Sequence, residues 1–145
     1  MSRVYTVRNT TTGAAATKTF ITIAALANQR IKLRALLLGN SAATAAQGVE
    51  WEILRLTADA TGTAQTPNPV DPDSSASRFT ALSTITGEGT AGAILAEFGF
   101  DIVGTYVLGL ASLLQFEAVN SGILAIRKTV GADTTNWAIT MWVEE

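Results

Sequence analysis

The chain has 145 residues, a length that favours a single domain with its own hydrophobic core. It contains no cysteine and no histidine, which excludes disulfides, thiolate chemistry and the commonest general base and metal ligand. The net charge of -2 creates no strong field toward nucleic acid or an anionic membrane, so we expect neither as a partner.

The composition points to a protein that buries part of its surface against other subunits. Charged residues make up 15% of the chain, well below the roughly 25% of an ordinary soluble domain. This favours an oligomer, and the alternative is an alanine-rich, weakly charged monomer. No signal peptide precedes VYTVRN, and the apolar stretch at 102–114 is too short to span a bilayer, so we expect a soluble chain made in a cytosol.

Alternating apolar and polar residues predict strands in the first half of the chain. Residues 1–12 are expected as a short strand or arm, and residues 13–145 as the folded domain. Strands are predicted at 17–24, 31–37 and 49–57. In the second of these, one face is expected to carry Ile31, Leu33, Ala35 and Leu37.

The strand at 49–57 has a mixed pattern. Trp51 and Ile53 face one way, and Glu50 and Glu52 the other. The alternation then blurs at residues 54–56, as it does where both faces of a strand are covered.

The second half of the chain begins with a predicted long loop. Residues 58–78 contain all three prolines, and a short helix is expected at 74–82. Further strands are predicted at 94–100 and 113–119, followed by a final hairpin of 122–130 and 137–143. The expected fold is therefore all-β: one antiparallel β-sandwich, jelly-roll-like, with one long proline-containing loop and little helix.

Two motifs suggest ligand binding, but both have simpler explanations. Gly87-Glu88-Gly89-Thr90-Ala91-Gly92 matches G-x-G-x-x-G, yet a strand rather than a helix follows it, which favours a glycine-rich turn. Asp71-Pro72-Asp73 offers oxygens to calcium, but the spacing also suits a turn with an aspartate cap.

Carboxylate pairs and serines give no catalytic pattern. Glu50 and Glu52 share a strand face and could do acid–base work, but a solvated face or salt bridges to Lys32, Arg34 or Arg55 explain them better. No histidine is present to activate a serine. We therefore expect no enzyme activity, no cofactor and no metal.

The remaining signals concern contacts with other proteins. Arg30, Lys32 and Arg34 form the densest basic cluster, which suits either docking onto an acidic protein surface or a solvated strand face. On the last strand, Trp137 shares a face with Ile139, Met141 and Val143. Trp142 lies on the opposite face, and an exposed tryptophan favours a neighbouring subunit.

Taken together, these segments resemble the small decoration, or cement, proteins of tailed bacteriophage heads. The resemblance rests on the order of TKTFITIAA, the segment from ANQRIKLRALLLGN to TADATG, the loop TPNPVDPDSSA, ITGEGTAGAILAEFGF and the ending GILAIRKTVGADTTNWAITMWVEE. It implies a jelly-roll-like β-sandwich that sits on the capsid exterior as a homotrimer. Its partner would be the major capsid protein, and its role would be to stabilise contacts between the subunits of the shell.

Two segments are the expected contact elements: the proline-stiffened stretch at 66–75 and the N-terminal residues 1–12. The alternative function is a carbohydrate- or receptor-binding β-module of a phage head fibre or tail. The candidate subunit or capsid contacts are Arg3, Tyr5, Arg30, Lys32, Arg34, Pro67, Pro69, Asp71, Pro72, Asp73 and Trp142.

Overall fold

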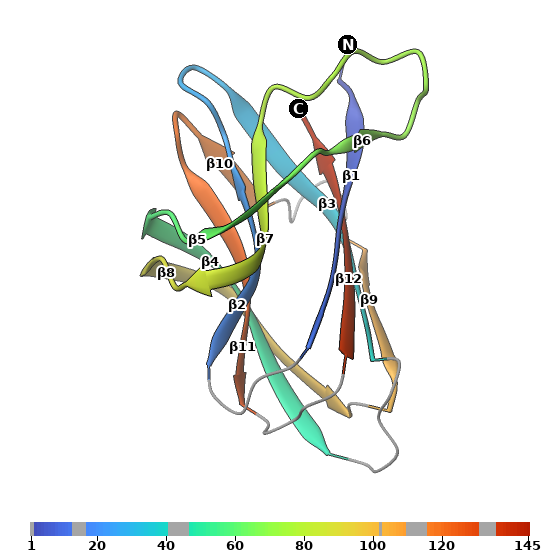
Figure 1. The fold of residues 1–145 in the computed structure, drawn as a ribbon, viewed down its shortest axis with the longest axis vertical. Coiled ribbons are helices and arrows are strands. Elements are labelled where there is room, and N and C mark those ends of the chain that lie inside the picture. Colours follow the sequence, from blue (N-terminus) through green and yellow to red (C-terminus); the bar gives the residue numbers. More distant parts are fainter. Residues whose placement is uncertain (1, 13–16, 41–46, 102, 110–115, 131–135) are drawn as a thin grey trace.

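Two antiparallel sheets pack face to face in the computed structural model, which describes residues 2–12, 17–40, 47–101, 103–109, 116–130 and 136–145 (Figure 1). The strands are β1 (Val4–Thr12), β2 (Lys18–Ala24), β3 (Arg30–Asn40), β4 (Gly48–Ala58), β5 (Thr61–Gln65), β6 (Asn68–Pro69), β7 (Thr80–Gly87), β8 (Thr90–Asp101), β9 (Thr105–Gly109), β10 (Phe116–Val119), β11 (Ile123–Val130) and β12 (Asn136–Glu144). None of the described residues is helical.

The strand order is that of a jelly roll. Sheet A runs β10-β3-β12-β1-β6, with β9 also paired to β3, and sheet B runs β5-β7-β2-β11-β4-β8. Strands from the two ends of the chain pair with each other, and each further pair lies inside the previous one in sequence. These pairs are β1 with β12, β2 with β11, β3 with β9 and β10, and β4 with β8. A two-stranded ribbon folded over onto itself gives this arrangement, so the predicted jelly-roll-like β-sandwich is confirmed.

The core between the sheets is aromatic at its centre. The Trp51 ring lies 5.0 Å from that of Phe20 and 5.0 Å from that of Trp137, measured between centroids. Trp137 is fully buried, and the residues predicted to share its face are buried with it: Ile139, Met141 and Val143. Each such aromatic pair adds about 0.5–1.5 kcal/mol beyond simple burial.

A second, smaller core lies outside sheet B. Strands β4 and β5 are separated by a short bend, as are β7 and β8, and β5 pairs with β7 just as β4 pairs with β8. The bent ribbon covers Leu54, Leu56, Ala60, Ile85 and Ala125. Both faces of β4 are buried from Trp51 to Leu54, but Arg55 is exposed between Leu54 and Leu56, so the stretch covered on both faces lies earlier on the strand than the predicted residues 54–56.

Two β-bulges change which side chains face the core. Phe20 has no partner on β11, because Ile21 pairs with Ile126 and Thr19 with Arg127, and both Phe20 and Ile21 therefore reach the core. On β3 the extra residue is Arg34.

The Arg34 bulge makes the predicted facing of β3 wrong beyond residue 33. Leu36 and Leu38 are buried in the core, whereas Ala35 and Leu37 lie on the outer side. One inserted residue reverses the alternation, since side chains alternate with a period of two.

Three other expectations are corrected. The run 58–78 is not loop throughout, because β5 and β6 lie inside it. The helix at 74–82 is wrong, since β7 begins at Thr80. The final hairpin is also wrong: β11 pairs with β2 and β4 in sheet B, while β12 pairs with β1 and β3 in sheet A. A polar connection between two alternating strands suits a crossing between sheets as well as a hairpin, so local sequence does not separate the two.

Candidate interaction surfaces

The outer side of sheet A carries few charges around Trp142; one of them is the exposed Arg8 on β1, which pairs across the strands with Thr140. Trp142 pairs across the strands with Ala35 and Thr6, and Leu37 pairs with Thr140 and Val107. Val107 is 66% exposed, and Trp142 is half-buried. We call this surface, made of Thr6, Ala35, Leu37, Val107, Gly109, Thr140 and Trp142, the Trp142 face.

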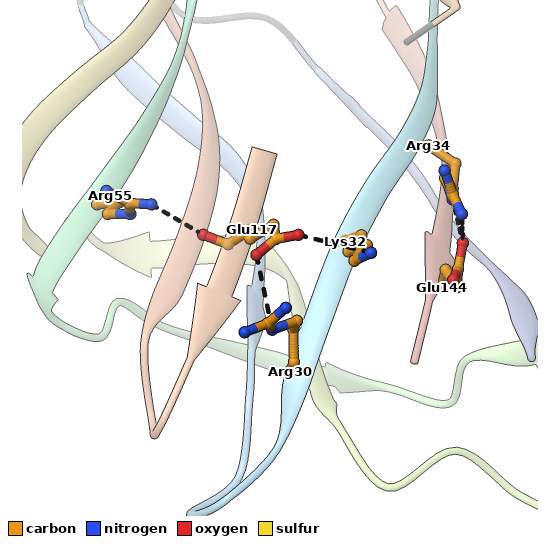
Figure 2. Close-up of polar contacts among 6 residues, drawn as sticks. All are labelled: Arg30, Lys32, Arg34, Arg55, Glu117 and Glu144. Atoms are coloured by element: carbon orange, nitrogen blue, oxygen red, sulfur yellow. Dashed lines mark hydrogen bonds and ion pairs between the residues drawn. The ribbon is translucent and has the colours of Figure 1, made fainter. Parts of the chain in front are cut away.

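A row of paired charges borders the Trp142 face (Figure 2). Glu117 on β10 lies 3.6 Å from Arg30 and 3.6 Å from Lys32 on β3, and its backbone carbonyl accepts a 3.1 Å hydrogen bond from Arg55. Arg34, which the bulge turns outward, forms an ion pair with Glu144 on β12. The predicted basic cluster is thus largely neutralised by two carboxylates.

The proline-containing segment folds back along β1. Tyr5 pairs with Pro69, and the Val70 amide donates to the carbonyl of Val4 at 2.9 Å. The Tyr5 hydroxyl donates to the carbonyl of Ser75 at 2.9 Å, and the Tyr5 ring packs edge-on against Phe79. This segment is therefore held along the edge of sheet A by its own chain.

The sequence-predicted contact residues fall into two groups. Arg3, Tyr5, Pro69, Asp71 and Asp73 come together at the end of the molecule where both termini lie (Figure 1). Trp142, Lys32 and Arg34 lie on or beside the outer side of sheet A.

Arg30 joins the two groups, because it pairs with Glu117 and also lines a hollow with Arg3. Within the proline-containing segment, Pro67 is buried and Pro72 is exposed.

Several residues at these surfaces were not singled out by the sequence. Glu117 and Glu144 neutralise the basic cluster, and Val107 extends the Trp142 face. Arg78 and Glu145 meet Arg3 and Arg30 in one hollow. The local signals for these surfaces were the period-two pattern on β12 and the spacing of Arg30, Lys32 and Arg34, whereas the contacts of Glu117, Glu144 and Val107 join segments far apart in sequence.

The structure also assigns the two ligand-like motifs to turns. A Cβ added at Gly89 would lie 2.5 Å from the carbonyl oxygen of Ala58, so glycine permits two backbones to approach at the ribbon bend. The Asp71 carboxylate accepts a 3.0 Å hydrogen bond from the Asp73 amide, which closes a turn of the kind aspartate favours.

The paired glutamates of β4 have different environments. Glu52 is buried and pairs with Arg127, a partner the sequence analysis did not name. Glu50 is exposed and lines a shallow hollow of about 300 Å³ together with Glu97.

The described residues lack two larger features of a functional site. Across the described ranges, no group of three or more acidic side chains could hold a metal ion. In the part of the chain that the structure describes, no helix has the length and apolar character needed to cross a membrane.

Comparison with known proteins leaves the family open. No family model and no curated protein matches the chain. A solved chain from the T13 IBDV viral particle, described as "a missing link in icosahedral viruses evolution", aligns with 99% of this chain at 12% identity and a TM-score of 0.35. The present chain spans only 31% of that chain's length, and the likeness identifies neither family nor function.

Proposed function

We propose that this chain is a structural virion protein that binds the outside of an assembled capsid and stabilises contacts between major capsid protein subunits. Its jelly-roll topology is one that viral capsid and lectin domains use. Because a fold alone does not decide function, the proposal rests on the Trp142 face.

The Trp142 face suits burial against another protein. Its side chains are apolar or hydroxyl-bearing, and they lie on adjacent, hydrogen-bonded strands. Covering them would remove exposed apolar area from water at about 25 cal/mol per Å². The bordering charges Lys32, Arg34, Glu117 and Glu144 already have partners, so a protein that reaches them would not have to neutralise them, but it would have to accommodate Arg8 beside Thr140.

The capsid role follows from mass action. A protein that binds assembled shell better than free shell subunits shifts the equilibrium toward the assembled state. As a homotrimer the chain would match a three-fold position of a shell, where symmetry multiplies each weak contact. Its place would be the virion exterior, after synthesis in the host cytoplasm.

The test is the solution mass of the wild-type chain and of Trp142→Ala, measured by light scattering on a sizing column. We expect a mass near three times 15.2 kDa for the wild type and a shift toward the monomer for the variant. Ile94→Ala is the control, because Ile94 is 51% exposed and lies on β8 of sheet B, away from the Trp142 face.

Co-sedimentation with assembled capsids that lack the chain then tests the capsid role. Binding to assembled shells with little binding to free shell subunits is the expected result. A chain that stays in the supernatant but binds a glycan on an array would contradict the proposal and favour the carbohydrate- or receptor-binding module.

A further inference from the structure

Three arginines from separate segments surround one hollow at the end of the molecule that carries both termini (Figure 1). The hollow measures about 310 Å³ and is lined by Arg3, Asn28, Gln29, Arg30, Arg78 and Glu145. Arg3 precedes β1, Arg30 begins β3, and Arg78 lies just before β7. We call this site the arginine hollow.

The arginine hollow carries surplus positive charge. Arg3 donates to the neutral hydroxyl of Ser75, and the guanidinium of Arg78 has no polar partner among the residues that the structure describes. Arg30 shares Glu117 with Lys32, and its side chain is 64% exposed. Three arginines therefore line a hollow whose only acidic lining residue is Glu145.

The Glu145 carboxylate accepts hydrogen bonds from neutral amide donors. These donors are the Arg78 backbone amide at 2.9 Å and the Gln29 side-chain amide at 3.1 Å. The Glu145 backbone is paired in both directions with Arg3. Glu145 thus holds the walls together through neutral donors and leaves the guanidinium groups available to a ligand.

The surroundings of the arginine hollow suit an extended peptide. Asn28, Gln29 and Arg30 also line a neighbouring hollow of about 250 Å³, together with Val119 and Asn120. Val119 is 43% exposed and offers contact to an apolar side chain. On the other side, Arg3 borders a hollow lined by Asp71 and Asp73, whose carboxylates would repel an acidic ligand.

From this arrangement we infer that the arginine hollow docks an acidic segment of a partner protein, with carboxylates on Arg3, Arg30 and Arg78 and an apolar residue against Val119. Guanidinium groups bind carboxylates through paired, charge-assisted hydrogen bonds, which fix orientation as well as strength. The inference stands whether or not that partner belongs to a capsid.

The test measures binding of a fluorescein-labelled peptide, Gly-Glu-Leu-Glu-Gly, to the full chain by fluorescence anisotropy at low salt. Gly-Gln-Leu-Gln-Gly is the matched neutral probe. We expect Arg78→Gln to weaken binding about tenfold and the double variant Arg3→Gln/Arg78→Gln to weaken it further. Arg78→Lys should fall between, since lysine keeps the charge but loses the planar pair of donors.

Arg8→Gln is the control, because Arg8 is an exposed arginine on sheet A outside the hollow and its loss changes the net charge equally. It should alter binding by less than about twofold, the size of a weak surface charge effect. Equal loss in Arg8→Gln and Arg78→Gln would overturn the inference, and so would equal binding of the neutral peptide. If inorganic phosphate, at the same total concentration of negative charge as the peptide, displaced the acidic peptide completely, the hollow would be a phosphate site and the inference would be wrong.

Discussion

Asn9 on β1 donates a hydrogen bond from its side-chain amide to the backbone carbonyl of Phe20 on β2, across 2.7 Å and from one sheet to the other. Phe20 is the bulged residue of β2, unpaired with β11. The buried Asn9 amide therefore satisfies a carbonyl at the bulge and joins the two sheets at the same point.

Replacing Asn9 should destabilise the fold by removing this link. We expect Asn9→Ala to lower the free energy of unfolding by about 1–3 kcal/mol, because the Phe20 carbonyl would stay buried without its donor. Urea denaturation measures the change. Thr10→Ala, one residue along on the exposed side of β1, is the control and should change stability by less than about 0.5 kcal/mol.

Glu52 and Arg127 should behave as a pair. The Glu52 side chain is only 3% exposed, so Arg127→Met would leave a buried carboxylate without its cation. We expect that single change to cost about 3–5 kcal/mol, and the double change Glu52→Leu/Arg127→Met to cost clearly less. A double-mutant cycle from denaturant unfolding measures the coupling, and additive losses would show that the two side chains act independently.

Gly89 should tolerate no side chain. A Cβ there would meet the carbonyl oxygen of Ala58 at 2.5 Å and the amide nitrogen of Ala60 at 2.9 Å. We expect Gly89→Ala to cost about 1–3 kcal/mol, since the ribbon bend must open to admit the methyl group. Gly48→Ala is the matched control, because its Cβ would meet nothing within 4 Å. Thermal unfolding of the two variants should separate them clearly.

Tyr5 should anchor the proline-containing segment through its hydroxyl. Tyr5→Phe keeps the ring contact with Phe79 but removes the hydrogen bond to the Ser75 carbonyl. We expect a loss of about 1 kcal/mol and faster proteolytic cleavage between residues 70 and 78. Unchanged cleavage would mean that other contacts hold this segment in place.

Period-two patterns predicted most long strands and the opposite facing of Trp137 and Trp142, because these depend on neighbours in the chain. They could not predict the Phe20 and Arg34 bulges, which appear only when a partner strand is known. The strand β7 was missed because TALSTITG is built from small and hydroxyl-bearing residues, which also suit a loop.

The surfaces were predicted less well than the strands. Arg34 and Glu144 are 110 positions apart, and only the pairing of β3 with β12 brings them together. The same holds for Arg3 and Arg78, which meet because the proline-containing segment folds back along β1. Charges that look like a basic cluster in sequence thus become mostly ion pairs, while Arg30 of that cluster also lines a basic hollow with Arg3 and Arg78.

The nesting of strand pairs has a consequence for how the chain reaches its native state. The Tyr5 and Glu145 side chains meet across 140 positions, and β1 completes its place in sheet A only against β12. Closing so long a loop costs entropy before any contact compensates for it, so topologies of this kind fold in milliseconds to seconds rather than microseconds. During synthesis β1 cannot pair with β12 until β12 has left the ribosome, so the Trp142 face, which includes residues of both strands, cannot be complete before then.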